Sequence, residues 1–129
     1  MPRLVSIITP TFGTNSFLRD LHRCVKTQTY PNIEWLVMDD RPSPSETMKR
    51  ISDQNVSYEH VRTGLTIGEK RNRLIEKSRG EIIAQFDGGN YYSPDYLLRM
   101  AQLLETSDSD LVSLHGLYLY DARHKLFGY

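Results

Sequence analysis

An α/β fold with a doubly wound, mostly parallel sheet and helices on both faces is the fold class that this sequence predicts. Short apolar runs that favour strands alternate along the chain with segments whose apolar residues have helical spacing. Strands that alternate with helices pair in parallel through right-handed crossovers. The sharpest local feature is the turn Asp87-Gly88-Gly89-Asn90, between an apolar run and a helix-start signal. Open α/β sheets bind ligands at that end of their strands.

The first half of the chain contains five predicted elements, separated by turns rich in proline and polar residues. They are a strand over residues 4–9 that stops at Pro10, a helix over 16–27, a strand over 33–38, a short helix over 46–52 and a strand over 56–61. The second strand ends at Asp39 and Asp40, so two carboxylates follow it directly. We therefore expect both acids at the carboxyl edge of the sheet.

The second half begins with a clear helix-start signal. Thr66 and Glu69 have the spacing of a capping box, which opens a helix over residues 66–78, and Gly80 closes it. Ser93 and Pro94 have the types preferred at an N-cap and the first helical position. The remaining predicted elements are a strand over 82–86, a helix over 94–105 and strands over 111–114, 117–120 and 125–129.

The composition excludes several classes of protein. In the 129 residues, sixteen basic residues balance sixteen acidic ones, so no net field attracts nucleic acid or an anionic membrane. Cys24 is the only cysteine, which fits a reducing compartment. No apolar stretch approaches the roughly 20 residues of a membrane span, and the early first strand leaves no room for a secretory leader. We expect a cytoplasmic chain whose exposed edge strands offer a route to self-association.

Three loops should meet at the carboxyl edge of the sheet, over residues 9–13, 39–43 and 87–91. The helix that starts near Thr66 adds a fourth contributor. A carboxylate such as Asp40 can accept the ring N–H of a pyrimidine base. A diphosphate needs cations or helix N-termini, and Lys70 and Arg71 lie in the first turns of a helix. Asp87 and Asn90 offer the hard oxygen ligands that a divalent cation prefers.

Each of these features also has a purely structural interpretation. Adjacent aspartates often lie in a solvent-exposed turn without any further role. Basic residues interleaved with acids usually form the solvent-exposed face of a helix. Asp87 and Asn90 can stabilise a tight turn. Cys24 is most simply a packed thiol, and the four histidines lack metal-ligand spacing. No P-loop and no dinucleotide-binding glycine motif is present. A phosphoacceptor domain of flavodoxin-like topology is a weaker alternative, because the lysine that it needs after a late strand is missing.

Taken together, the motifs resemble the nucleotide-sugar-binding region of inverting family 2 glycosyltransferases, which have the GT-A fold. The matching stretches are VSIITPTF at residues 5–12, QTYPNIEWLVMDD at 28–40, KRN at 70–72, GEIIA at 80–84 and YYSPDYL at 91–97. The resemblance implies a single domain over residues 1–129, forming the N-terminal part of a longer enzyme. It also implies a UDP-sugar donor, whose sugar passes to an acceptor hydroxyl.

The resemblance also assigns roles to particular residues. Asp40 would hold the base, the backbone around Pro10 and Thr11 would border the nucleoside, and Arg71 would face the ribose or the phosphates. With these, the complete set of donor-binding candidates is Pro10, Thr11, Asp39, Asp40, Lys70, Arg71 and Asp87. A Mg²⁺ or Mn²⁺ ion bridging the diphosphate would be bound after the strand over 82–86, by Asp87 and Asn90.

The sequence departs from the family pattern at this metal motif. Gly88 and Gly89 match the positions of the ion-holding carboxylates, and Arg41-Pro42 replaces the usual glycine and serine. The family's general base lies further downstream than Tyr129, so no catalytic residue is assigned. We therefore expect that the isolated chain does not transfer sugar efficiently. The alternative hypothesis is a catalytically degraded relative that serves as a nucleotide-binding or interaction module.

Overall fold

The computed structural model describes residues 1–11, 15–62 and 64–129. Phe12 and Gly13, part of the predicted loop after the first strand, lie outside the described residues. The chain divides into two compact units, Met1–Leu98 and Arg99–Tyr129, and each is described by itself. None of the helices in the described parts is long and apolar enough to span a bilayer.

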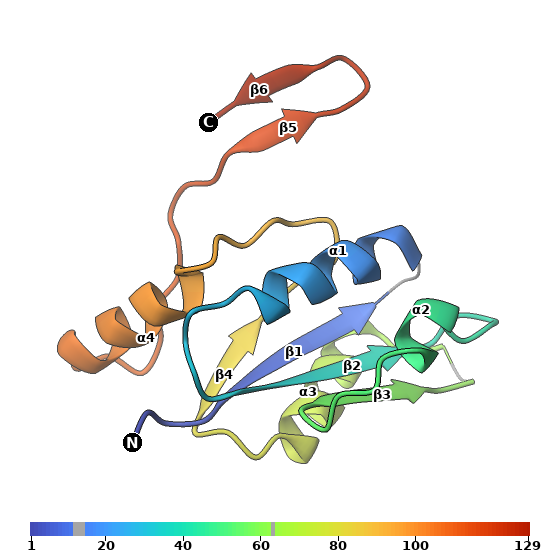
Figure 1. Cartoon of the computed structure of the whole chain (residues 1–129), viewed down its shortest axis with the longest axis horizontal. Coiled ribbons are helices and arrows are strands. Elements are labelled where there is room, and N and C mark those ends of the chain that lie inside the picture. The colour runs from blue at the N-terminus through green and yellow to red at the C-terminus, as the bar shows by residue number, and fades with distance from the viewer. Residues whose placement is uncertain (12–14, 63) are drawn as a thin grey trace. The chain divides into compact units, whose positions relative to one another are not determined.

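The first unit contains a four-stranded sheet in which every neighbouring pair is parallel (Figure 1). Its strands are β1 (Val5–Thr11), β2 (Ile33–Asp39), β3 (Val56–His60) and β4 (Ile82–Gln85), in the order β3-β2-β1-β4. β1 is buried along its whole length because strands flank it on both sides. The prediction of a parallel α/β sheet is confirmed.

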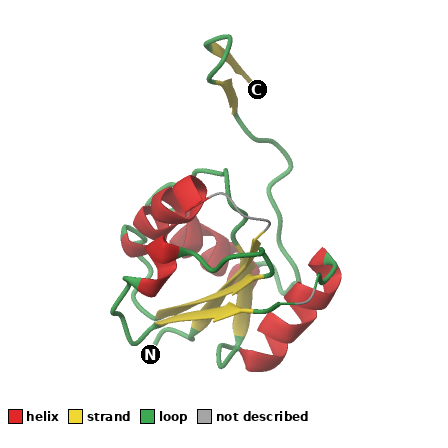
Figure 2. Ribbon diagram, turned by 90° about the vertical axis from the view of Figure 1, so that its right-hand side faces the viewer, coloured by secondary structure: helices red, strands yellow, loops and turns green. Residues whose placement is uncertain are grey.

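Helices cover both faces of this sheet (Figure 2). Helices α1 (Asn15–Lys26) and α2 (Glu46–Lys49) contact each other on one face, and α3 (Ile67–Lys77) packs against β1 and β2 on the other. The α2 helix is a single turn, so it stops before the predicted end at Ser52. The capping box predicted for α3 is present, with Thr66 and Glu69 each bonded to the other's backbone N–H.

The two faces of the sheet have separate cores because neighbouring residues of a strand point to opposite sides. Ile8, Leu36 and Met38 are buried together with Leu74 of α3. On the face of α1, Trp35 stacks on His22 with ring centroids 5.7 Å apart and donates its indole N–H to Thr9. The central strands therefore have the nearly continuous apolar sequence of doubly covered parallel strands.

The first strand continues through Pro10, where the sequence predicted that it would stop. Pro10 pairs with Met38 in the ladder, and the strand ends at Thr11. The carbonyl of Ile8 accepts from Phe86, so the backbone groups of Ile8 face β4. Pro10, two residues later, faces the same side, beyond the last β4 pairing at Gln85. Its missing N–H therefore removes no ladder hydrogen bond.

The predicted role of Gly80 as the closing residue of a helix is also corrected. The C-cap of α3 is Ser78, and Gly80 does not have a positive φ. A Cβ at position 80 would instead lie 2.5 Å from Ser6 Oγ and 2.7 Å from the carbonyl oxygen of Leu4. Glycine is required here for close backbone packing against β1.

Helix α4 (Tyr96–Thr106) crosses the boundary between the two units and begins two residues later than predicted, because residues 93–95 form a turn. The second unit then ends in an antiparallel hairpin of β5 (Leu119–Asp121) and β6 (Leu126–Gly128), both shorter than predicted. The predicted strand over residues 111–114 is wrong. That stretch has no ladder partner, and an apolar run alone does not make a strand.

Candidate functional site

Loops from both sides of β1 meet at the carboxyl edge of the sheet. Asp40 follows β2 and Asp87 follows β4, and consecutive residues of α3 join them. Lys70 Nζ lies 2.7 Å from Asp40 Oδ1, and Arg71 Nη2 lies 3.5 Å from Asp87 Oδ1. The two predicted loops therefore converge on one site, to which Lys70 and Arg71 contribute the cations.

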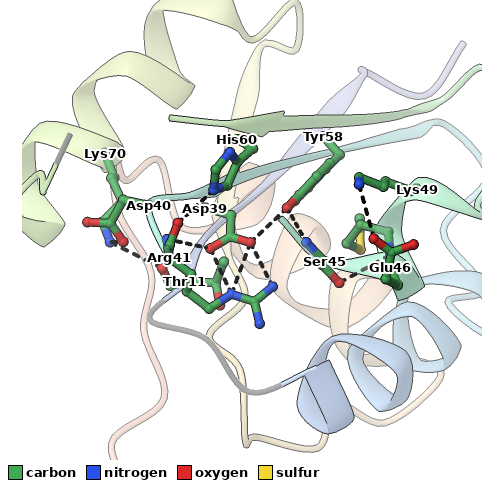
Figure 3. A network of polar contacts seen from close by, with 11 residues as sticks. Thr11, Asp39, Asp40, Arg41, Ser45, Glu46, Lys49, Tyr58, His60 and Lys70 are labelled. Atoms are coloured by element: carbon green, nitrogen blue, oxygen red, sulfur yellow. Dashed lines mark hydrogen bonds and ion pairs between the residues drawn. The ribbon is translucent and has the colours of Figure 1, made fainter. Parts of the chain in front are cut away.

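Asp40 is fixed by two donors, the side chain of Lys70 and the backbone N–H of Leu65. Figure 3 shows Lys70 beside Asp40. Lys70, whose side chain is 0% exposed, donates to Asp40 and to the carbonyl of Thr11, and the N–H of Leu65 reaches Asp40 Oδ2 at 3.1 Å. Burial opposes ionisation of Asp40, but the hydrogen bonds from Lys70 and Leu65 and the charge of Lys70 outweigh it. The pKa of Asp40 is therefore lowered. The carboxylate is held ionised, with 12% of the side chain open to solvent.

Asp39, also a predicted donor-binding residue, is instead enclosed by protein. Its side chain is fully buried, Arg41 donates to both carboxylate oxygens, and the Tyr58 hydroxyl donates to Oδ2 at 2.7 Å. Burial opposes ionisation, yet the hydrogen bonds from Arg41 and Tyr58 lower the pKa of Asp39. Tyr58 also accepts the N–H of Ser45, which ties the loop after β2 to β3. Asp39 thus stabilises the loop that carries Asp40.

A cavity of about 640 Å³ opens beside Asp40. Its lining residues are Asp40, Arg41, Pro42, Pro44, His60 and Arg62. His60 Nε2 lies 2.6 Å from the carbonyl oxygen of Arg41, while Arg62 is exposed. Sequence reasoning missed His60 and Arg62 as site residues. His60 lies near the end of the third predicted strand and Arg62 directly follows it, at the same sheet edge as Asp40, and this position was the signal that could have found them.

Arg71 has unused hydrogen-bonding capacity. Its side chain is 29% exposed, and its Nε is buried with no hydrogen-bond partner among the described residues. A guanidinium has five N–H donors. A buried donor without a partner costs about 1–3 kcal/mol. The part of the guanidinium that is open to solvent offers donors to an anionic ligand at this edge.

The turn between β4 and α4 is held by aromatic stacking. Tyr92 stacks on Phe86 with ring centroids 3.8 Å apart, and its hydroxyl accepts the N–H of Asp87 at 2.9 Å. Gly89 has a φ of 88°, which glycine adopts without strain. These contacts fix the backbone at Asp87 and so position its carboxylate.

The residues of this turn do not fit a divalent cation. Asp87 supplies a carboxylate that already faces Arg71, and Gly88 and Gly89 supply no side-chain ligand. The amide nitrogen of Asn90 lies 3.5 Å from the Tyr92 hydroxyl. Within residues 1–11, 15–62 and 64–129, no cluster of three or more His, Cys, Asp or Glu side chains is arranged to hold a metal. We derive no chemical step through a metal.

The other predicted site residues lie at the same edge. Pro10 and Thr11 are buried at the end of β1, and Thr11 contributes its carbonyl to Lys70. The capping box of α3 satisfies the N–H groups of Thr66 and Glu69 at the helix N-terminus. Of the two cations on α3, Arg71 is the more open.

Comparison with known proteins identifies the family. The family model described as glycosyl transferase family 2 matches residues 6–124. The EpsH protein of Bacillus subtilis, which is named as a glycosyltransferase, is 30% identical over 115 residues that cover 84% of this chain and 32% of EpsH. Glycosyltransferase GlyG of Streptococcus pneumoniae is 24% identical over 125 residues, covering 94% of this chain and 41% of GlyG. The chain thus spans less than half the length of these relatives.

Solved structures show the same fold. Residues 1–349 of S. aureus TarS superpose with a TM-score of 0.71 at 22% identity, covering 82% of this chain and 33% of that one. The mannosyltransferase PcManGT of Pyrobaculum calidifontis, solved with GDP-Man and Mn²⁺, has a TM-score of 0.69 at 19% identity, covering 78% and 32%. The fold is GT-A, as the resemblance predicted, and the chain belongs to glycosyl transferase family 2.

Proposed function

We propose that this chain binds a nucleotide-sugar donor, most simply a UDP-sugar, as the donor-binding part of a glycosyltransferase. The observation that carries the proposal is the pairing of consecutive residues, Lys70 and Arg71, with Asp40 and Asp87 from loops on opposite sides of β1. This arrangement places a fixed acceptor and a cation with free donors at one sheet edge. A nucleoside diphosphate needs both of these groups, one for its base and one for its phosphates.

The residues suggest how the donor would be held. The ionised Asp40 would accept the ring N–H of uracil, while the end of β1 at Pro10 and Thr11 would border the nucleoside. Arg71 would donate to the phosphates, because charge-assisted hydrogen bonds from a guanidinium are strong and directional. In the transfer itself, an acceptor hydroxyl would lose its proton to a general base as its oxygen attacks the anomeric carbon, and the bond from that carbon to the diphosphate oxygen would break. Arg71 would stabilise the charge that develops on that leaving group.

Isothermal titration calorimetry with UDP, GDP, CDP and ADP tests this proposal on the full chain. We expect UDP to bind, and Asp40→Asn to weaken UDP binding at least about tenfold, because the amide loses the charge of the acceptor. Asp53→Asn is the matched control, since Asp53 is exposed and its carboxylate accepts the backbone N–H of Asn55 in its own turn. Failure of all four nucleotides to bind would refute the proposal.

The second candidate function is a relative that binds the donor without catalysing transfer. Gly88 and Gly89 favour it, because they remove the carboxylates expected of the family motif. Release of UDP from a UDP-sugar separates the two candidates. Turnover above the uncatalysed rate supports an enzyme, whereas tight donor binding without UDP release supports a binding module.

A further inference from the structure

The acidic contribution to the phosphate end of the site is a single carboxylate. In phosphate sites, Mg²⁺ is usually held by one or two carboxylates together with the phosphates. Asp39 and Asp40 are committed to Arg41 and Lys70, and Gly88 and Gly89 offer no oxygen from a side chain. Within residues 86–90, Asp87 is therefore the one acidic group that a cation could use.

Asp87 already faces a cation of the protein. Its Oδ1 lies 3.5 Å from Arg71 Nη2, and 47% of the side chain is exposed. A dication at Asp87 would lie beside the guanidinium and be repelled by it. The Arg71 side chain is 29% exposed, so part of its guanidinium is open to an anion beside its contact with Asp87.

We infer that this chain holds the diphosphate of its donor without a divalent cation, and that Arg71 supplies the positive charge in its place. The inference rests on the proposed function, because it concerns the same ligand. Lys70 and Arg41 each neutralise an aspartate, whereas Arg62 is exposed on the wall of the cavity. Arg71 in turn faces Asp87. The three aspartates of the site are therefore each paired with a cation, and Arg62 adds one further positive charge.

Substitution of Asp87 tests the inference, because the two interpretations of this residue predict opposite changes in the affinity for UDP. If Asp87 only faces Arg71, then Asp87→Asn frees the guanidinium and removes a negative charge that repels the diphosphate. The affinity for UDP then rises by about threefold to tenfold. If Asp87 ligates a metal, the same substitution weakens binding in the presence of that metal.

The experiment is calorimetry of UDP with the full chain, in EDTA and in Mn²⁺. We expect the same dissociation constant in both, within about twofold, tighter binding by Asp87→Asn, and a loss of about tenfold or more in Arg71→Gln under both conditions. Glu76→Gln is the control, because Glu76 is exposed on α3 and its substitution changes the net charge by the same amount as Asp87→Asn.

The outcomes separate this inference from the proposed function. An affinity that Mn²⁺ raises more than about tenfold, with the gain lost in Asp87→Asn, overturns the inference and leaves the proposed function standing. Absence of binding by UDP, GDP, CDP and ADP in both conditions overturns the two together. Binding in EDTA that Mn²⁺ does not change, with tighter binding by Asp87→Asn, supports both.

Discussion

Two adjacent aspartates illustrate how neighbouring residues of one type acquire different roles. Asp39 is the last residue of β2 and is enclosed by Arg41 and Tyr58, whereas Asp40 lies beyond the strand and keeps a partly open carboxylate. Both have a lowered pKa, so ionisation alone does not distinguish them. The two carboxylates differ in their exposure to solvent, because the side chain of Asp39 is enclosed and that of Asp40 is partly open.

The buried ammonium of Lys70 makes a strong prediction at the residue scale. Lys70→Met leaves Asp40 with its largely buried charge uncompensated, so the free energy of unfolding at pH 7 should fall by about 3 kcal/mol. Urea denaturation measures the change. Lys49→Met is the matched control, because Lys49 pairs with Glu46 on the surface and its loss should change the free energy of unfolding by less than about 1 kcal/mol.

The same variant should differ from the parent in its pH dependence. In the parent, the pKa of Asp40 is lowered, so its stabilising contribution is present above the unfolded-state pKa of about 3.9 and is lost as the pH falls through the folded-state pKa. In Lys70→Met, the loss of the ammonium raises the pKa of Asp40 above its value in the parent, so the variant has less of this stabilising contribution to lose in acid. The difference in stability should therefore narrow below neutral pH. A constant difference from pH 7 to pH 4 would contradict the pairing.

At the scale of elements, Gln28 joins the end of α1 to the start of α4. Its side-chain nitrogen donates to the carbonyls of Cys24 and Ser93, and its oxygen accepts the N–H of Leu97. Gln28→Ala removes these three hydrogen bonds and leaves the N–H of Leu97 without its acceptor, while Cys24 and Ser93 keep the donors Thr27 and Tyr96. Thermal or urea denaturation should therefore show a loss of about 2 kcal/mol. Thr29→Ala removes one exposed hydrogen bond to Pro94 and is expected to cost less than about 1 kcal/mol. Equal losses in the two variants would refute this role for Gln28.

Local sequence signals predicted helices and strands well where the signal residues form hydrogen bonds with backbone groups only a few residues away. The capping box of Thr66 and Glu69 is such a signal, because its hydrogen bonds depend on local spacing alone. Pro10 and Gly80 were misinterpreted for the opposite reason. Their effects depend on which strand lies beside them, and that is known only once the sheet has formed.

The same distinction applies to the site. Sequence order placed Asp40, Arg71 and Asp87 at one sheet edge, and the contacts of α3 agree with that placement. The full burial of Lys70 could not be predicted, since the sequence of α3 does not say which of its several cations faces the sheet. The cavity beside His60 and Arg62 depends on how the loop after β2 folds back onto β3, which is a tertiary contact.

The two edges of the sheet in the first unit have different roles. At the amino edge, the buried carboxylate of Glu34 accepts hydrogen bonds from the hydroxyl of Ser6 and from the backbone and guanidinium of Arg79. The carboxyl edge instead has Asp40 partly open and Arg71 with a nitrogen that has no partner within residues 1–11, 15–62 and 64–129. The hydrogen-bonding groups of Glu34 at the amino edge are therefore saturated. At the carboxyl edge, in the part that the structure describes, hydrogen-bonding groups remain that a ligand could use.

This division predicts that stability and donor binding can be changed independently. Glu34→Gln places an amide N–H₂ among groups that are all donors, so the free energy of unfolding should fall by about 2 kcal/mol while the dissociation constant for UDP stays unchanged. Burial opposes ionisation of Glu34, but the hydrogen bonds from Ser6 and Arg79 outweigh it and lower the pKa of Glu34. The parent is therefore more stable than Glu34→Gln above the unfolded-state pKa of about 4.3, and it loses this difference in stability as the pH falls below that value.

Arg71→Gln should show the reverse pattern, because Arg71 is partly exposed and its contact with Asp87 is long. We expect weaker UDP binding and a free energy of unfolding within about 1 kcal/mol of the parent. Urea denaturation and calorimetry on both variants measure the two quantities side by side. If Glu34→Gln weakened UDP binding as much as Arg71→Gln does, the edges would be coupled through the strands. The carboxyl edge would then not act as a separate binding surface supported by an independently stabilised sheet.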